Sequence, residues 1–182
     1  MDTDKTALRN ALPYRDCVGI ALFNRAGQVF IARRIFSPGP DTSEVEQPWQ
    51  MPQGGIDPGE DPLKAAHREL FEETSVRSVS LIEAIDNWIY YDLPDEVLGI
   101  ALKGKYRGQR QKWFAFLLTG EDGEIDLDAP GSGTIDPEFD AWRWEDFAAV
   151  HDIIVPFKRP AYLKVQQAFS HIPARLAAGD KA

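Results

Sequence analysis

The sequence predicts one α/β (α+β) domain in which helices pack on both sides of a mixed central sheet. The chain has 182 residues, which is about the length of one domain. Hydrophobic residues make up 43% and charged residues 27%, both near the usual values for globular proteins. Many short runs rich in β-branched and aromatic residues alternate with few helical patterns, which favours a sheet packed between helices.

Seven short runs are predicted to be strands, since they are dense in apolar and β-branched residues and are bounded by turn or loop residues. The first two are separated by Asn24-Arg25-Ala26-Gly27, which predicts a hairpin. Polar segments rich in Pro, Gly, Asp and Glu predict loops at residues 37–47 and 121–136. The predicted strands are residues 18–23, 29–32, 49–51, 78–82, 85–91, 111–118 and 140–144.

The clearest helix is predicted over residues 62–74. Asp61 can cap it, Pro62 suits its first position, and apolar residues recur at helical spacing. A short helix is expected at residues 146–150 and a closing helix at about 160–176. We therefore assign residues 13–176 to a single domain, with residues 1–12 and 177–182 as flexible tails.

Charge and composition argue against several classes of binding partner and cellular location. The net charge of −9 argues against a surface that binds duplex DNA. No apolar run approaches the roughly 20 residues that span a bilayer, so no membrane association is expected. Cys17 is the one cysteine, which excludes an intrachain disulfide and fits a reducing compartment. The N-terminus lacks the apolar centre of a signal peptide, and we expect a cytoplasmic protein.

Three carboxylates share one face of the predicted helix. At about 100° per residue, Glu69, Glu72 and Glu73 fall within an arc of about 100°. Carboxylates this close repel one another unless they spread into water or a cation lies among them. Ligands that are all oxygen favour Mg²⁺ or Mn²⁺ over zinc. The alternative is a solvated helix face, which is the usual meaning of a bare charge run.

The spacing around these carboxylates carries a more specific signal. Gly54 is followed after five residues by Glu60, and after seven more by Arg68-Glu69-Leu70-x-Glu72-Glu73-x-x-Val76. This pattern resembles the signature of the Nudix hydrolases, which implies a Nudix-type α/β/α sandwich and hydrolysis of a phosphoanhydride. The resemblance implies that Glu69, Glu72 and Glu73 bind the divalent cations and act in catalysis, that the Gly54 carbonyl is a further ligand, and that Arg68 pairs with Glu60.

One position departs from the family pattern. Ser75 stands directly before Val76, where the family usually has glycine. Glycine there commonly ends the helix with a positive φ. We expect serine either to adopt that conformation at a modest cost or to end the helix differently, with the catalytic face unchanged.

Segments outside this box resemble one subfamily, the RNA pyrophosphohydrolases, which are close kin of dinucleoside polyphosphate hydrolases. The resemblance runs from about residue 14 to 169 and rests on segments such as Trp49-Gln50-Met51-Pro52-Gln53, Gln111-Lys112-Trp113-Phe114 and Val155-Pro156-Phe157-Lys158-Arg159. It implies that 5′-triphosphorylated or diphosphorylated RNA is converted to 5′-monophosphorylated RNA, with dinucleoside polyphosphates as the alternative substrate. Protein partners are left open.

The same resemblance implies roles for residues that contact the substrate. Glu138 would lie near the metals as a ligand or as the general base. The expected substrate contacts are a base held between Arg34 and Phe157, its edge lined by Arg15, Val155 and Lys158, and phosphate oxygens facing Arg110 and Lys112.

Each of these residues also has an ordinary structural interpretation. A cation alone is often a solvated surface residue, Phe157 alone is more often core, and Glu138 alone is an exposed loop carboxylate. Two further classes of function compete with an enzyme: a non-catalytic module that senses nucleotides, and an acidic interaction domain. The intact Glu69, Glu72, Glu73 and Arg68 argue against the sensor, and an acidic interaction domain would require the motif to be accidental.

Overall fold

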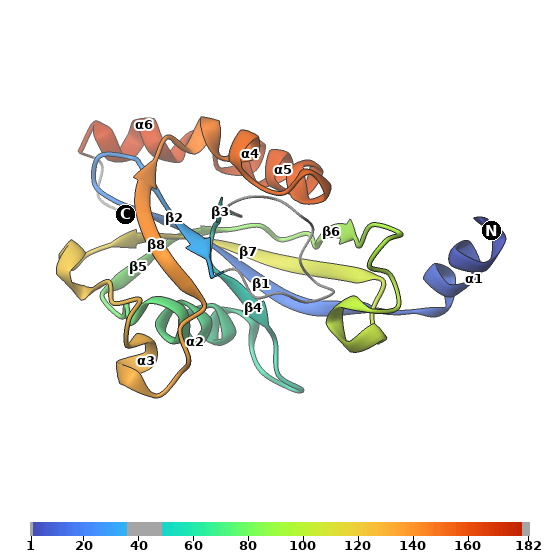
Figure 1. The fold of residues 1–182 in the computed structure, drawn as a ribbon. Helices are drawn as coiled ribbons and strands as arrows, with labels where there is room; N and C mark the ends of the chain where they lie inside the picture. Colours follow the sequence, from blue (N-terminus) through green and yellow to red (C-terminus); the bar gives the residue numbers. More distant parts are fainter. Residues whose placement is uncertain (1, 36–48, 180–182) are drawn as a thin grey trace.

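The computed structural model describes residues 2–35 and 49–179, so the loop predicted at residues 37–47 lies outside the described residues. A single sheet lies between two layers of helices (Figure 1). One face of the sheet carries α2 (Pro62–Thr74) and α3 (Pro130–Gly133), and the other carries α4 (Val150–Ile153), α5 (Arg159–Phe169) and α6 (Ile172–Ala177).

The sheet is mixed, as predicted. Its central pair, β1 and β7, is parallel over the full length of β1, and the other pairs in the described chain are antiparallel. The order of the main path is β3-β2-β1-β7-β5, with β4 paired to β1, β6 to β7 and β8 to β2. The strands are β1 (Tyr14–Phe23), β2 (Val29–Arg34), β3 (Trp49–Gln50), β4 (Gln53–Gly55), β5 (Val79–Ala84), β6 (Ile89–Asp92), β7 (Gly108–Leu118) and β8 (Phe139–Glu145).

The central strands are apolar on both faces because helices cover both faces of the sheet. Along β1, Ile20 and Leu22 pack into the core beneath α2, whereas Ala21 and Phe23 pack into the core beneath α5 and α6. This explains why β1 is a continuous apolar run in the sequence, without the alternation of a strand that has one face in water.

Local signals set the bounds of α2 as predicted. The Asp61 side chain accepts a hydrogen bond from the Lys64 amide at 3.1 Å, and Pro62 stands at the first helical position. Ala66 and Leu70 are fully buried against the sheet. The face that is left carries the glutamates, so the amphipathic pattern determines which side chains can reach a substrate.

The N-terminal segment differs from the expected flexible tail. It forms α1 (Asp2–Ala11), which projects from the domain (Figure 1). Arg9 forms an ion pair with Asp95 at 2.5 Å and lies 3.6 Å from Asp92. The Lys5 ammonium donates to the Asp95 carbonyl at 2.8 Å. Basic side chains on α1 therefore attach the helix to the acidic segment that follows β6, a long-range interaction that the local pattern does not reveal.

The predicted closing helix is broken in two. α5 ends at Phe169 and α6 begins at Ile172. Pro173 has no amide proton, and inside a continuous helix its ring would meet the carbonyl of Phe169, so the chain turns before it. Within residues 2–35 and 49–179, no helix is long and apolar enough to cross a membrane.

The segment between β6 and β7 carries unusual backbone geometry. It includes the 3-10 turn η1 (Ala101–Gly104), in which Leu102 has φ 53° and Lys103 has φ 59°. Left-handed conformation costs a non-glycine residue roughly 1–2 kcal/mol. Backbone hydrogen bonds from Leu93 to the Arg107 carbonyl and from Arg107 to the Pro13 carbonyl hold the two ends of this segment.

Candidate active site

The strand before α2 and the glutamate face of α2 meet at a glycine. Gly54 lies in β4 opposite Val18 of β1. A side chain at position 54 would collide with the carboxylate of Glu69. Because glycine has no Cβ, the β4 backbone runs directly against this carboxylate, and both residues line the same cleft.

Arg68 connects the loop before α2 to the carboxylates of the helix. Its Nε and Nη2 donate to the two oxygens of Glu60 at 2.9 and 2.8 Å, and Nη2 also donates to the Gly55 carbonyl at 2.8 Å. Its Nη1 donates to Glu69 at 2.8 Å and to Glu72 at 3.0 Å. These hydrogen bonds from Arg68 hold the pKa of Glu60 at about 2, well below its usual value. The pair predicted between Glu60 and Arg68 is thus the centre of a larger network.

Glu73 is the most deeply placed of the three helix carboxylates. Its side chain is buried, and one oxygen accepts a hydrogen bond from the Gln53 amide at 3.2 Å. Burial raises the pKa of Glu73 well above its usual value, and repulsion from Glu138 and Glu69 raises it further. Burial also raises the pKa of Glu69. Of the three helix carboxylates, Glu69 lines the cleft, whereas Glu72 and Glu73 do not. Burial and repulsion at Glu69 and Glu73 both favour neutralisation of the negative charge on this side of the cleft.

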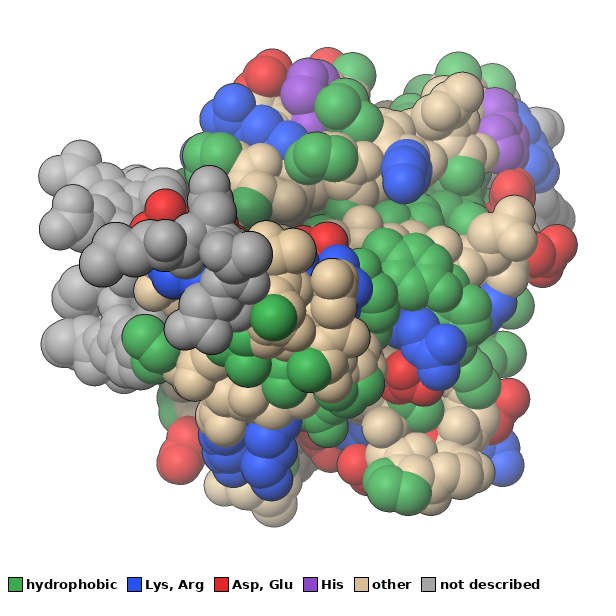
Figure 2. Space-filling view, turned by 90° about the vertical axis from the view of Figure 1, so that its right-hand side faces the viewer, with side chains coloured by type: hydrophobic (Ala, Val, Ile, Leu, Met, Phe, Trp, Pro, Cys, Tyr) green, Lys and Arg blue, Asp and Glu red, His purple; other side chains and the backbone are tan. Residues whose placement is uncertain are grey.

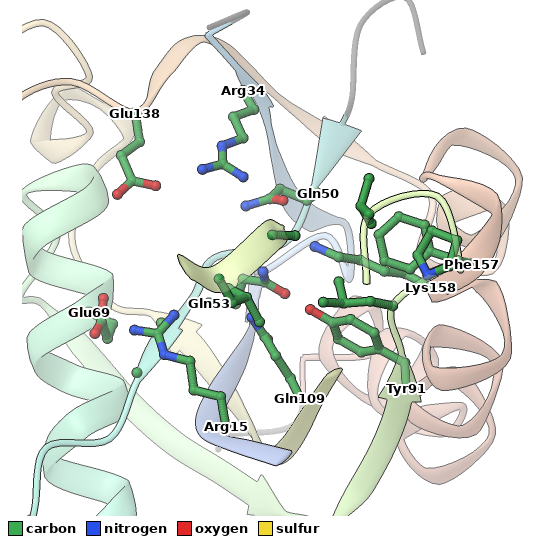
Figure 3. A pocket seen from close by; sticks show the side chains of 17 residues that line it. Arg15, Arg34, Gln50, Gln53, Glu69, Tyr91, Gln109, Glu138, Phe157 and Lys158 are labelled. Atoms are coloured by element: carbon green, nitrogen blue, oxygen red, sulfur yellow. The ribbon is translucent and has the colours of Figure 1, made fainter. Parts of the chain in front are cut away.

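The cleft has a volume of about 330 Å³ and joins two chemically different walls. Glu69 and Glu138 point into it from one side, and Tyr91, Phe157 and Lys158 lie on the other (Figure 3). The face of the molecule on which α1 projects is hollowed, and acidic and basic side chains lie side by side there (Figure 2). The cleft is therefore shaped for a substrate that carries both phosphate and an aromatic base.

The basic and aromatic wall is built from β1, β2, β6 and the segment after α4. The rings of Tyr91 and Phe157 have centroids 5.7 Å apart, and the Lys158 ammonium lies 5.6 Å from the Tyr91 ring centroid. Burial, together with the nearby Arg34 charge, lowers the pKa of Lys158 to about 8. Arg15 and Arg34 also line the cleft, and no ion pair joins either to a carboxylate within the described chain. Their positive charge is free to meet an anion.

A row of glutamines forms the floor of the cleft and was missed by the sequence analysis. Gln111 donates to Gln53 and to Gln109, both at 3.0 Å, and accepts from the Trp113 indole at 3.0 Å. The strand period of two predicts this, because Gln109, Gln111 and Trp113 alternate with charged residues along β7 and must share a face. Tyr91, which lines the cleft from β6, was missed as well.

The two charged residues that alternate with Gln109, Gln111 and Trp113 lie on the opposite face of β7. Arg110 donates to both oxygens of Asp16 at 2.6 and 2.9 Å, and its guanidinium lies 4.6 Å from the Trp88 ring centroid. Lys112 donates to the Asp86 carbonyl. Neither lines the cleft, so their contact with phosphate oxygens stays a prediction. Val155 also does not line the cleft, although it lies two residues before Phe157.

The carboxylates of α2 and Glu138 form a candidate site for a divalent cation. As the side chains stand, no three His, Cys, Asp or Glu side chains of the described residues lie close enough together to hold a metal ion. The chemistry of the donors does fit a hard cation: all are oxygens, and the buried Glu73 and its neighbours repel one another.

The chain matches the model of a known protein family. The family model described as the NUDIX domain matches residues 13–165. The chain belongs to the Nudix family. Curated Nudix relatives span nearly the whole chain. A protein of Azorhizobium caulinodans named RNA pyrophosphohydrolase is 53% identical, over 87% of this chain and 93% of its own. A protein of the same name from Mesorhizobium japonicum is 51% identical, over 94% of this chain and 99% of its own.

Solved structures of Nudix proteins share the fold at low sequence identity. A C. elegans Ap4A hydrolase complex superposes with a TM-score of 0.55 at 16% identity, over 85% of this chain and 98% of its own. The E. coli dihydroneopterin triphosphate pyrophosphohydrolase gives a TM-score of 0.58 at 19% identity, over 84% of this chain and 96% of its own. These likenesses show the fold.

Ser75 stands where the Nudix pattern has glycine, and α2 nevertheless ends with the same kind of cap. Ser75 has φ 64° and its amide donates to the Phe71 carbonyl at 2.8 Å, so it takes the left-handed cap that glycine would take. Of the two outcomes expected from the sequence, serine therefore adopts the strained one. Its hydroxyl is 3.4 Å from the Ala129 carbonyl and from the Ser132 amide, which is weak compensation.

Proposed function

We propose that this Nudix protein is an RNA pyrophosphohydrolase that converts 5′-triphosphorylated or diphosphorylated RNA ends to 5′-monophosphate. The products released are pyrophosphate or phosphate. The observation that carries the proposal is the cleft, in which a carboxylate wall faces a wall of cations and aromatic rings across about 330 Å³. The names of relatives that are 51–53% identical support the same substrate class.

Divalent cations, Mg²⁺ or Mn²⁺, belong to this proposal. Glu69, Glu72 and Glu73, with the Gly54 carbonyl, are the groups that would hold them, and Glu138 would act either as a further ligand or as the general base. A cation bound there supplies Lewis-acid stabilisation of the anionic oxygens of the anhydride. Binding requires Arg68 to share or release Glu69 and Glu72, because it now binds both through one nitrogen. Arg68 keeps its two bonds to Glu60 in that event, so the loop stays attached to the helix.

Glu138 is the proposed general base. It lies in the loop before β8, is exposed, and lines the cleft opposite the cationic side chains (Figure 3). Its carboxylate takes the proton of the attacking water, whose oxygen bonds to phosphorus as the bridging P–O bond breaks. No covalent enzyme intermediate is needed, and the leaving phosphate or pyrophosphate departs as an anion.

The far wall of the cleft is proposed to hold the nucleotide. Arg34 and Phe157 present a guanidinium plane and an aromatic ring, the two kinds of flat partner that stack on a base. Lys158 lies close to this position, whereas Arg15 reaches into the cleft from the side of Glu69, and both provide positive charge for the phosphates or the polar edge of the nucleotide (Figure 3). An RNA-end substrate also fits the cytoplasmic location that we expect from the sequence.

Dinucleoside polyphosphates are the second candidate substrate, since the same wall suits an adenosine. The deciding experiment compares kcat/KM on triphosphorylated RNA and on diadenosine tetraphosphate in one magnesium buffer, by release of pyrophosphate or phosphate and by nucleotide product. We expect the ratio to favour RNA by at least tenfold. A ratio that favours diadenosine tetraphosphate would replace the proposal with its alternative. Nucleotide binding without any hydrolysis would make the protein a sensor and overturn both.

A further inference from the structure

A second hollow lies directly beside the cleft. Its volume is about 370 Å³, and it is lined by Arg15, Leu102, Lys103, Lys105 and Tyr106. Arg15 and Leu102 also line the cleft itself, so the two hollows share a wall. A chain that leaves the cleft over this wall enters the second hollow.

The lining of the second hollow is positive although the chain as a whole carries a net charge of −9. It contains Arg15, Lys103 and Lys105 and no acidic residue. In residues 2–35 and 49–179, neither lysine has an ion-pair partner. Neighbouring arginines differ: Arg107 pairs with Asp92 at 2.7 Å, and Arg110 pairs with Asp16 at 2.6 Å. The positive charge of the hollow is therefore not neutralised by the protein itself.

The backbone beneath these lysines is strained. Leu102 and Lys103 are consecutive non-glycine residues in the left-handed region, and both belong to the lining. Gly104 follows with φ 68°, and the Lys105 amide donates to the Leu102 carbonyl at 3.3 Å. Strain of this kind persists where surrounding contacts impose it, and it concentrates at ligand sites. The same turn fixes the two lysines on one wall.

We propose that this hollow binds the phosphodiester backbone of the RNA downstream of the nucleotide held in the cleft. The inference rests on the proposed function, since it names where the rest of that substrate lies. A phosphodiester carries one negative charge per nucleotide, and Lys103 and Lys105 provide the unneutralised cations that would meet it. The wall formed by Arg15 and Leu102 is where the RNA would cross.

The test is the dependence of kcat/KM on RNA length. Triphosphorylated RNAs of two, four and eight nucleotides with the same first two bases are compared at fixed magnesium. We expect kcat/KM to rise about tenfold from two to four nucleotides, chiefly through KM, and then to level off. In the Lys103→Gln/Lys105→Gln variant the ratio of four to two nucleotides falls toward one. In Lys103→Arg/Lys105→Arg, which keeps the charges, the ratio is restored.

A matched control removes the same kind of charge elsewhere. Lys164 is an exposed residue of α5 that lines neither hollow, so Lys164→Gln keeps the wild-type ratio. The salt dependence gives a second measurement. For single strands the slope of log affinity against log salt is about −0.7 per phosphate contact, so the double variant loses about 1.4 from the slope measured on the octanucleotide.

Failure of this inference and failure of the proposed function give different results. Hydrolysis of RNA with equal kcat/KM at two and four nucleotides, or a length effect that the Gln variant retains, overturns the downstream site and leaves the activity intact. Absence of hydrolysis on every RNA, with diadenosine tetraphosphate cleaved, overturns the proposed function and the downstream site together.

Discussion

The two walls of the cleft differ in how their charges are balanced. On the carboxylate wall, Arg68 makes five hydrogen bonds that join Glu60, Glu69, Glu72 and the loop backbone. On the opposite wall, Arg34 faces the cleft without an ion pair in the described chain, and Arg15, whose guanidinium lies against Gly55 near Glu69, has none either. The charges of the carboxylate wall are held by hydrogen bonds within the protein. The positive charges of the opposite wall are left for the substrate to neutralise. Substitutions on the two walls should therefore separate turnover from binding.

The largest expected effect is on the carboxylate wall. Glu72→Gln or Glu73→Gln should lower kcat by about 10³-fold, because several kcal/mol of charge stabilisation in the transition state are lost. Melting temperature in the absence of metal should stay the same or rise for Glu73→Gln, since burial and repulsion already disfavour its charge. Steady-state rates and thermal melts measure the two. A wild-type rate in either variant at saturating magnesium would remove that glutamate from the mechanism.

On the opposite wall the change should appear in KM. Phe157→Leu keeps an apolar side chain of similar bulk but removes the flat ring, and stacking on a base is worth roughly 1–3 kcal/mol. We expect KM for RNA to rise about 5- to 100-fold with kcat little changed. Phe157→Tyr is the matched control and should stay within about threefold of wild type. An unchanged KM in the Leu variant would return Phe157 to a core role.

A smaller effect is expected from pH through Lys158. Its pKa is about 8 in the folded protein against 10.5 for an unperturbed lysine side chain, so the folded state binds fewer protons between these values. Stability from this group therefore rises with pH from about 8 to 10.5, and below pH 8 the buried charge opposes folding. Substrate affinity should change in the opposite direction, because Lys158 loses its charge above about pH 8.

Two measurements made across about pH 7–10 test this. KM for RNA should rise above about pH 8 in the wild type and follow a flatter profile in Lys158→Gln. The difference in unfolding free energy between the two proteins, from denaturant titrations, should shift in favour of the wild type over the same range. Parallel KM profiles would show that Lys158 does not meet the substrate.

The smallest effect concerns the end of α2. Ser75→Gly should raise the unfolding free energy by about 0.5–1 kcal/mol, because glycine adopts a positive φ without strain and the serine hydroxyl makes only long contacts. For a chain of this size that corresponds to about 1–4 °C in Tm. Activity should stay the same. Lower stability in the glycine variant would assign the serine contacts a larger role than their lengths suggest.

Sequence reasoning succeeded where the determinants are local. Asp61, Pro62 and the apolar spacing define α2, and the spacing from Gly54 to Glu73 identified the carboxylate wall and the Glu60–Arg68 pair. It failed where the determinants are distant. The helix at residues 2–11 is attached through Asp95, and Tyr91 reaches the cleft only because β6 pairs with β7.

The break in the closing helix and the placement of Arg110 and Lys112 outside the cleft lining both had signals in the sequence. Pro173 predicts a break in the closing helix, since it cannot donate to Phe169. Alternation along β7 separates Arg110 and Lys112 from the glutamines that face the cleft, because side chains of a strand point to opposite faces in turn. The prediction considered only residue type, and it therefore grouped Arg110 and Lys112 with the other cations of the site. The left-handed backbone conformation of Leu102 and Lys103 had no signal in the sequence.

The parallel pairing of β1 with β7 has a consequence for how the protein acquires its structure. Tyr14 pairs with Gly108 and Phe23 with Leu117, so the middle of the sheet closes only after most of the polypeptide has been synthesised. Contacts between residues this far apart along the chain slow folding. Until these contacts form, the apolar residues of β1 are not yet paired with β7. The central pair of the sheet can therefore form only once β7 has been synthesised and has paired with β1.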